Sequence, residues 1–279
     1  MVTNGKALAP SASVADTVSI EIFIVRLDPN HNELLQQLWQ EVDEQSLPPK
    51  LRRELLEEGL RVGVLGNLIT PALARLLNIS AEGKTHASWG EFQEYSAADA
   101  ARETVKRNVR VLMPDMHAII KVFDDQHRLP ELIMFRKENG MLCAQTYTNA
   151  TGLFFVSAAA NKDGSAQFQI LPAIEYGIPQ QHIRVVAGTL IQDAGKPRHP
   201  FDSLTVSQRL LPGQWLIMGT TTPDSAGAGK AFFVRKDSAL DQRLLAIRLS
   251  HVAPATSSYS ADLPPPNPRK EEAMMPERN

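Results

Sequence analysis

Short apolar runs bounded by turn-forming residues dominate the second half of the chain. They are rich in β-branched or bulky side chains and lie at 167–172, 182–186, 204–210, 214–218, 231–234 and 243–249. Gly, Pro, Asp or Asn separates them, which is typical of antiparallel strands. Further candidate strands lie at 116–123, 131–135, 142–147 and 153–157. Together they predict about ten strands and favour a β-sandwich or a strongly curled sheet over alternating βαβ units.

The clearest turn signal is the sequence Leu211-Pro212-Gly213-Gln214. Proline presets φ for the second position of a turn, and glycine supplies the positive φ that a type II turn needs at the third. The flanking strands are therefore expected to form a hairpin.

The first part of the chain combines strand and helix patterns. Residues 18–27 alternate and then become continuously apolar, as in a strand whose second half is covered on both faces. From Asn32 to about Glu44 apolar residues recur at helical spacing, so this helix is expected to pack its apolar stripe against a sheet.

A second helix is expected after Ser46, a candidate N-cap, and it would end at Gly59 in the left-handed C′ position. A strand at 60–66 and a helix that opens at Thr70-Pro71 follow. The order strand, helix, helix, strand, helix indicates a small α/β layer, and the pattern leaves the relative direction of its two strands open.

These patterns predict an α+β fold built from a small α/β unit and a larger, mainly antiparallel β-domain. The expected segments are a disordered lead-in at 1–17, the α/β unit at 18–80, a connector at 81–108, the β-domain at 109–252 and an unfolded Pro-rich tail at 253–279.

Composition narrows the classes of function. The 279 residues carry a formal net charge of -2, with no sign of the basic stripe that nucleic-acid binding requires. No run of about 18 apolar residues predicts a transmembrane segment, and the first residues do not look like a secretory signal. The chain is expected to be soluble, and cytoplasmic by default.

Two glycine-containing stretches invite a nucleotide-binding interpretation. At Gly227–Lys230 the Walker pattern would need glycine at Asp224 and Ser or Thr at Ala231, and a strand is expected to follow. We interpret it as a hairpin loop. Gly63 and Gly66 match only part of a dinucleotide fingerprint and are assigned to a tight turn.

The densest group of possible metal ligands is Asp115, His117, Asp124, Asp125 and His127. If 116–123 is a strand, its two ends lie roughly 20 Å apart at about 3.3 Å per residue, so they cannot share one ion. Asp-Asp in a loop is typical of a turn. No metal or cofactor is predicted, and metal binding by the 124–127 group stays open.

No catalytic residue is predicted. The single cysteine, Cys143, has apolar flanks and is expected to be buried, with no activating base nearby in the sequence. Glu57 and Glu58 lie near Arg52 and Arg53 on a helix end, which is typical of a solvated surface. Neither a Gly-x-Ser-x-Gly elbow nor a His-Glu-x-x-His motif is present.

The continuous apolar runs at 153–156 and 231–234 should be covered on both faces. We expect the helices of the first unit to supply that cover. A partner surface or a self-association edge is the alternative.

Four segments, 51–66, 172–180, 201–204 and 211–214, resemble a family of uncharacterised planctomycete-type bacterial proteins. The resemblance covers about 18–250 and implies the cell envelope, because members often begin with an export or lipoprotein signal. Residues 206–219 also resemble a strand-turn-strand segment of the secretin β-domain, without the secretin Val-Pro-x-Leu-Gly-Asp signature.

We therefore predict a non-catalytic structural or protein-interaction module, associated by resemblance with the bacterial envelope or a secretion-type assembly. A protein partner or self-association is expected. The alternative is an enzyme or small-ligand binder with a site built from dispersed residues. An exposed strand edge or apolar patch would favour the first, and a polar cluster in a concave pocket the second.

Overall fold

The computed structural model describes residues 16–28, 31–78, 104–124, 128–138, 141–186, 189–221, 227–236 and 240–253. Residues 16–254 form one compact unit. Most of the expected lead-in and connector, and almost all of the expected tail, lie outside the described residues.

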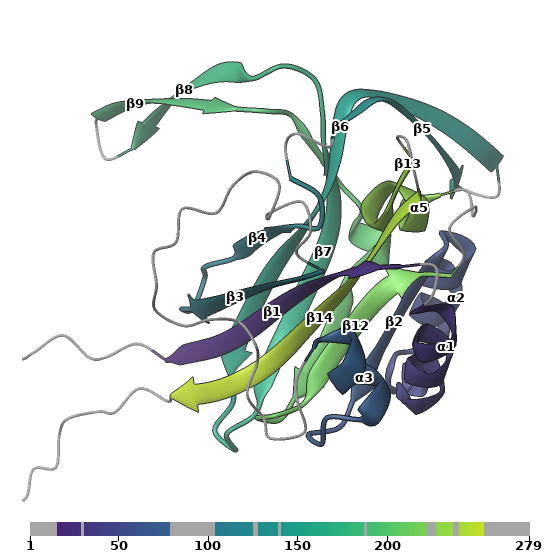
Figure 1. Ribbon diagram of the computed structural model, residues 1–279. Helices are drawn as coiled ribbons and strands as arrows, with labels where there is room; N and C mark the ends of the chain where they lie inside the picture. The colour runs from purple at the N-terminus through teal and green to yellow at the C-terminus, as the bar shows by residue number, and fades with distance from the viewer. Residues whose placement is uncertain are drawn as a thin grey trace, which may run out of the picture. The chain divides into compact units, whose positions relative to one another are not determined.

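The first sheet, called sheet I here, joins strands from both ends of the chain (Figure 1). Its order is β2 (Leu60–Leu65), β12 (Trp215–Thr220), β14 (Leu240–Ala253), β1 (Thr17–Leu27) and β3 (Val105–Leu112), and β13 (Val234–Lys236) also pairs with β14. All of these pairs are antiparallel.

The second sheet, sheet II, is built from the middle of the chain. Its order is β10 (Arg198–Pro200), β7 (Ala166–Glu175), β6 (Met141–Ala160) and β4 (Ala118–Lys121), with β11 (Val206–Leu210) on β7 and β5 (Leu129–Glu138) on β6. β8 (Gln180–Val186) and β9 (Thr189–Gly195) form a two-stranded sheet.

Sheet I is covered on one face by two helices, α1 (Asn32–Glu41) and α3 (Pro71–Leu76) (Figure 1). Leu38 and Trp39 of α1 share a buried cluster with Phe23 and Ile217 of the sheet. The apolar stripe of α1 therefore packs on a sheet, as its spacing predicts. Thr70 caps α3, because its hydroxyl accepts from the backbone N–H of Leu73 at 3.4 Å.

The larger core lies on the other face of sheet I and includes side chains of both sheets. Buried members from sheet I include Ile20, Ile22, Leu216, Leu245 and Ile247, and members from sheet II include Phe154, Val156, Phe168, Ile170 and Val206. The helix α2 (Pro49–Glu57) adds Leu55, and α5 (Ala228–Phe233) adds Phe232 and Phe233. The arrangement is a layer of helices, sheet I and then sheet II.

The structure confirms a mainly antiparallel β fold with few helices. The strands expected in a separate N-terminal unit belong to the same sheet as β14, the last strand among the described residues, since β1 pairs with β14 from Thr17↔Ala253 to Leu27↔Gln242. Pairing between distant strands follows from matching apolar faces and register, which a local pattern does not contain. β1 and β2 are not neighbours in this sheet.

Local capping differs from the prediction at Ser46. Asp43 caps a short 3-10 helix, Glu44–Ser46, by accepting from the backbone N–H groups of Gln45 and Ser46, and α2 begins only at Pro49. α1 ends at Glu41 because Asp43 bridges to Val64 of β2. Gly59 does adopt the expected positive φ, at 73°.

The predicted turn at 211–214 forms, but the predicted hairpin does not. Gly213 has φ 89°, and the N–H of Gln214 donates to the carbonyl of Leu211 at 3.0 Å. β11 before the turn pairs with β7, while β12 after it pairs with β2 and β14. The turn therefore carries the chain from sheet II to sheet I.

Two of the predicted strands, 142–147 and 153–157, are one continuous strand, β6. Asn149 lies between the two expected strands and has φ 50° inside β6. β6 pairs with β5 as far as Ala150 and with β7 from Thr151 onward. Asn149 thus marks the place where one strand changes partners.

Candidate functional site

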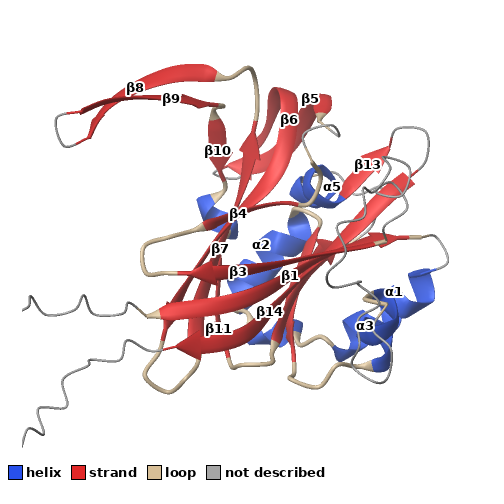
Figure 2. Cartoon of the chain, turned by 60° about the vertical axis from the view of Figure 1, so that its left-hand side comes forward, coloured by secondary structure: helices blue, strands red, loops and turns tan. Residues whose placement is uncertain are grey.

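Two outer strands that follow each other in the chain each have an edge with which no other described strand pairs. β3 is an outer strand of sheet I and pairs with β1, and β4 is an outer strand of sheet II and pairs with β6 (Figure 2). Residues 113–117 join them through a turn in which the N–H of Met116 donates to the carbonyl of Met113 at 3.1 Å. The described residues give neither strand a second neighbour.

Exposed apolar side chains line these edges. Between 41% and 55% of each is accessible, and the set is Val109, Val111, Met113, Met116 and Ile119. We call this set the β3–β4 surface. Single exposed apolar residues are ordinary on proteins, whereas several along two successive outer strands and their connection are typical of a contact surface.

The register fixes the orientation of the two valines. Val109 lies opposite Glu21 and Val111 opposite Ser19, so both point to the helix-covered face of sheet I. Arg110 follows Val109 in the strand, points to the opposite face and is exposed. The valines therefore share their face with Arg107, which is paired with Glu21, while Lys106 and Arg110 lie on the other face.

An ion pair anchors β3 next to the valines. Arg107 contacts Glu21, and the second oxygen of Glu21 lies 3.4 Å from Nη1 of Arg248 on β14. Glu21 thus links three neighbouring strands. This network fixes β3 in register without covering Val109 or Val111, which remain about half exposed.

The opposite edge of sheet I is protected. The backbones of Asp43 and Val64 exchange two hydrogen bonds, of 2.8 and 3.0 Å, on the side of β2 that faces away from β12. Gly63 permits this approach, because a Cβ there would lie 2.5 Å from Cγ1 of Val42. Gly63 therefore lies inside a strand, not in the tight turn that the sequence suggested. Proteins protect strand edges in this way to prevent unwanted pairing.

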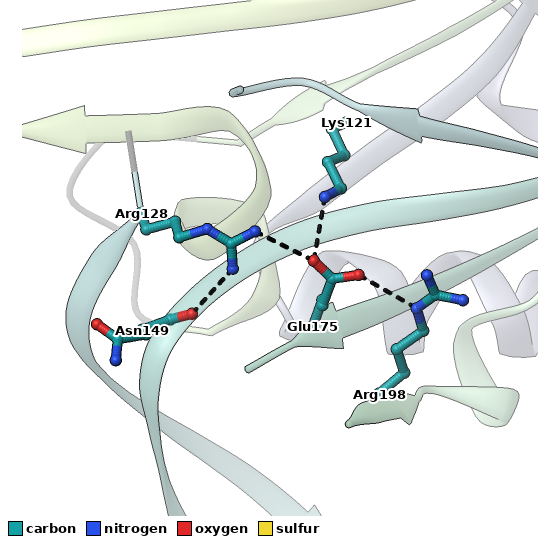
Figure 3. A network of polar contacts seen from close by, with 5 residues as sticks. All are labelled: Lys121, Arg128, Asn149, Glu175 and Arg198. Atoms are coloured by element: carbon teal, nitrogen blue, oxygen red, sulfur yellow. Dashed lines mark hydrogen bonds and ion pairs between the residues drawn. The ribbon is translucent and has the colours of Figure 1, made fainter. Parts of the chain in front are cut away.

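The strongest polar network is centred on Glu175, at the end of β7 (Figure 3). One of its carboxylate oxygens accepts from Nζ of Lys121 at 3.0 Å and from Nη2 of Arg128 at 3.2 Å, and the other from Nε of Arg198 at 3.2 Å. Arg128 also donates to the carbonyl of Asn149 at 3.4 Å.

Glu175 is almost completely buried. Burial by itself would raise the pKa of its carboxyl, but the hydrogen bonds and charge of Lys121, with the hydrogen bonds of Arg128 and Arg198, outweigh it and hold that pKa below its ordinary value of 4.5. The ionised carboxylate ties together β4, β7, β10 and Arg128, the residue before β5. Both oxygens of the carboxylate are bonded to cationic side chains from neighbouring segments, so the network is interpreted as structural.

The candidate metal ligands are not brought together in the part of the chain that the structure describes. No group of three or more His, Cys, Asp or Glu residues there could hold a metal ion. His117 instead lies edge-on to the ring of Phe155, with 5.2 Å between ring centroids. Asp125 and His127 lie outside the described residues.

The prediction at 227–234 is wrong, because a helix, α5, follows Gly227 where a strand was expected. The N–H of Gly229 donates to the carbonyl of Glu58 at 2.8 Å, and a Cβ on Gly229 would overlap the carbonyl oxygen of Gly59. The glycine is therefore explained by close packing. Asp224 lies outside the described residues.

Cys143 is exposed on β6, opposite Arg136 of β5, so the expectation that it is buried is wrong. Its apolar flanks occur in a part of β6 that pairs with β5 alone among the described strands.

Among the described residues, no helix is both long and apolar enough to cross a lipid bilayer.

No protein family model matches the chain, and no curated protein matches it. The resemblance to the planctomycete-type family therefore has no family-model support. Among solved structures, the chain is similar to the InvG secretin domain β-barrel from the Salmonella SPI-1 injectisome NC-base, at 11% identity and a TM-score of 0.21. The match covers 90% of this chain and 66% of that one, which is under two thirds. A likeness at this level carries no argument about fold or function.

Sequence reasoning missed the β3–β4 surface, because residues up to 108 were assigned to a connector. The alternation of charged and apolar residues at 105–112 was the available signal. It also missed Glu175, whose partners come from sequence positions between 23 and 54 residues away.

Proposed function

We propose that the chain is a non-catalytic protein-interaction module that binds a protein partner, or a second copy of itself, along the β3–β4 surface. The observation that carries this proposal is the pair of outer strands, to which the described residues give no second neighbour, with exposed apolar side chains along both and along their connection. An association with the cell envelope or a secretion-type assembly stays a prediction from the sequence resemblance.

The mode of binding that we propose is addition of a strand to β3. Outer strands present unpaired backbone N–H and C=O groups, and a partner segment in extended conformation can pair with them. Side chains at alternate positions then supply specificity. On β3 these are Val109 and Val111 on one face and Lys106 and Arg110 on the other.

Charge further restricts the partner. β3 contains Lys106, Arg107 and Arg110 and no acidic residue, and only Arg107 contacts a carboxylate in the described part of the chain. Acidic side chains opposite Lys106 and Arg110 would therefore favour binding. We expect a partner strand in which acidic and apolar residues alternate.

Light scattering after size-exclusion chromatography tests this function, with the purified chain alone and after cross-linking. We expect a mass above that of the monomer for the chain alone, or a cross-link to an added peptide in which acidic and apolar residues alternate. The double variant V109K/V111K should lose the association, because lysines on an outer strand oppose edge pairing. The matched control is L68K, which changes a residue that is 78% exposed and lies outside the β3–β4 surface.

Circular dichroism must show that both variants are folded. A strictly monomeric chain that fails to bind acidic, apolar-alternating peptides would contradict the proposal. So would association that V109K/V111K and L68K weaken equally.

A further inference from the structure

A second feature is a depression of ≈ 660 Å³ on sheet II, and Ile119 of the β3–β4 surface lies opposite its lining residue Phe155. Phe155 and Leu171 contribute its apolar part, and His117, Ser157 and Arg198 are among its polar residues. Phe155 lies opposite Leu171 in the β6–β7 pairing, so the two side chains are neighbours on one face. Volumes of this size are typical of sites for small ligands.

Arg198 is held in a defined position at this depression. Its Nε donates to Glu175 at 3.2 Å, and its guanidinium carbon lies 5.5 Å from the centroid of the Phe155 ring. These two contacts fix the plane of the guanidinium before any ligand arrives. A group fixed in advance loses less conformational entropy on binding.

The terminal amino groups of Arg198 are available. The structure shows no hydrogen bond from them to any described residue, and 39% of the side chain is accessible. Glu175 meanwhile accepts from Lys121 and Arg128 as well. A single carboxylate shared among three cationic groups does not satisfy the hydrogen-bonding capacity of Arg198.

The described residues that line the depression include no Asp or Glu. The two terminal amino groups of a guanidinium match the two oxygens of a carboxylate, which gives a charge-assisted pair of hydrogen bonds. The half-buried ring of Phe155 next to this point offers contact area to an apolar group.

We propose that this depression binds a carboxylate attached to an aromatic or apolar group, with the carboxylate on the terminal amino groups of Arg198 and the apolar part against Phe155 and Leu171. The carboxylate can come from a small organic acid or from the C-terminus of a polypeptide that ends in an apolar residue. Both sources present the same chemistry to Arg198.

Titration of the isotope-labelled chain, followed by NMR, tests the proposal with phenylacetate as the small acid and phenylacetamide as its neutral counterpart. The peptide Gly-Gly-Gly-Phe, with a free or an amidated C-terminus, tests the second source. We expect saturable shifts of the amide signals of His117, Phe155, Ser157 and Gln169 with at least one free acid. The matching amide should bind roughly tenfold more weakly, because it lacks the charge.

Three variants locate the binding. R198Q should weaken binding of the free acid by roughly tenfold, because the charged donor is lost. S157F should abolish binding by filling the depression, and it leaves the Arg198–Glu175 contact in place. R209Q is the control, since Arg209 is also a β-strand arginine of sheet II and is bonded to Ser165 and Asp163 away from the depression.

Binding by only one of the two acids identifies the source of the carboxylate and supports the proposal. Three results would overturn it. These are no saturable shift at the four amides with either acid, equal binding of acid and amide, and binding that R198Q and S157F leave unchanged.

Discussion

The ammonium nitrogen of Lys121 lies 3.0 Å from the carboxylate of Glu175, which is almost completely buried. Lys121 belongs to β4 and Glu175 to β7, and β6 lies between these strands. The pair therefore spans three strands of sheet II. Glu175 lies opposite Thr151, where β6 changes its pairing partner from β5 to β7. Replacing Glu175 therefore tests how much the ion pair stabilises sheet II.

Replacing Glu175 by glutamine should lower the free energy of unfolding by about 2–3 kcal/mol, because three cationic side chains lose the carboxylate that they share. This loss is smaller than the roughly 3–5 kcal/mol of a fully buried ion pair, because Arg198 is 39% exposed and its charge is screened by water. Urea denaturation measures the change. As a control, D163N alters an exposed partner of Arg209 and should cost less than about 1 kcal/mol. Equal losses in the two variants would contradict the structural role of Glu175.

The same carboxylate predicts a dependence of stability on pH. The folded-state pKa of Glu175 is below its ordinary value of 4.5, so the stabilisation is fully present above that value. It is lost as the pH falls through the lowered pKa. The difference in free energy of unfolding between wild type and E175Q should therefore be constant near neutral pH and shrink on acidification below 4.5. A difference that grows on acidification would be inconsistent with this assignment.

Gly229 should not tolerate alanine. A Cβ there would overlap the carbonyl oxygen of Gly59, which also accepts from the N–H of Thr221 at 2.9 Å. G229A should lower the free energy of unfolding by about 2 kcal/mol or more, because backbone atoms must move. G66A is the control, since no atom lies within 4 Å of a Cβ at Gly66. If G229A is as stable as G66A in thermal unfolding, the close approach of Gly229 to the carbonyl of Gly59 does not exist in the protein.

Phe232 packs in the core with ring centroids 4.9 Å from Phe154 and 6.2 Å from Phe201. F232A should lower the free energy of unfolding by about 3–5 kcal/mol, since a large buried ring leaves a cavity. L56A, at a side chain that is 44% exposed, should change it by no more than about 0.5 kcal/mol. Chemical denaturation distinguishes the two, and a small effect of F232A would place α5 outside the core.

The sequence predicted those elements whose signals are local. The alternation in 18–27, the helical spacing after Asn32 and the cap at Thr70 each depend on residues within a few positions, and β1, α1 and α3 form there. The turn at 211–214 is also local, and it forms. The local signal does not specify the pairing partners of the two strands that flank the turn. The hairpin prediction is therefore wrong, because β11 and β12 pair with other strands.

The remaining differences have tertiary causes. Residues 231–233 have the composition of a strand, but Gly229 fits against the backbone of 58–59, and Phe232 and Phe233 enter the core from a helix. Glu175 gives no signal in the sequence because Lys121, Arg128 and Arg198 are distant in it. The β3–β4 surface is visible only once β3 is known to be an outer strand.

Hydrogen exchange at the backbone of β3 tests the central claim most directly, because strand addition must protect amide groups that otherwise face solvent. The measurement compares the peptide that covers 105–112 at low and high protein concentration, and with an added partner or an acidic, apolar-alternating peptide. We predict slower exchange in 105–112 on association, while the buried centre of β14 stays unchanged. Association that leaves exchange in 105–112 unaltered would contradict the proposal.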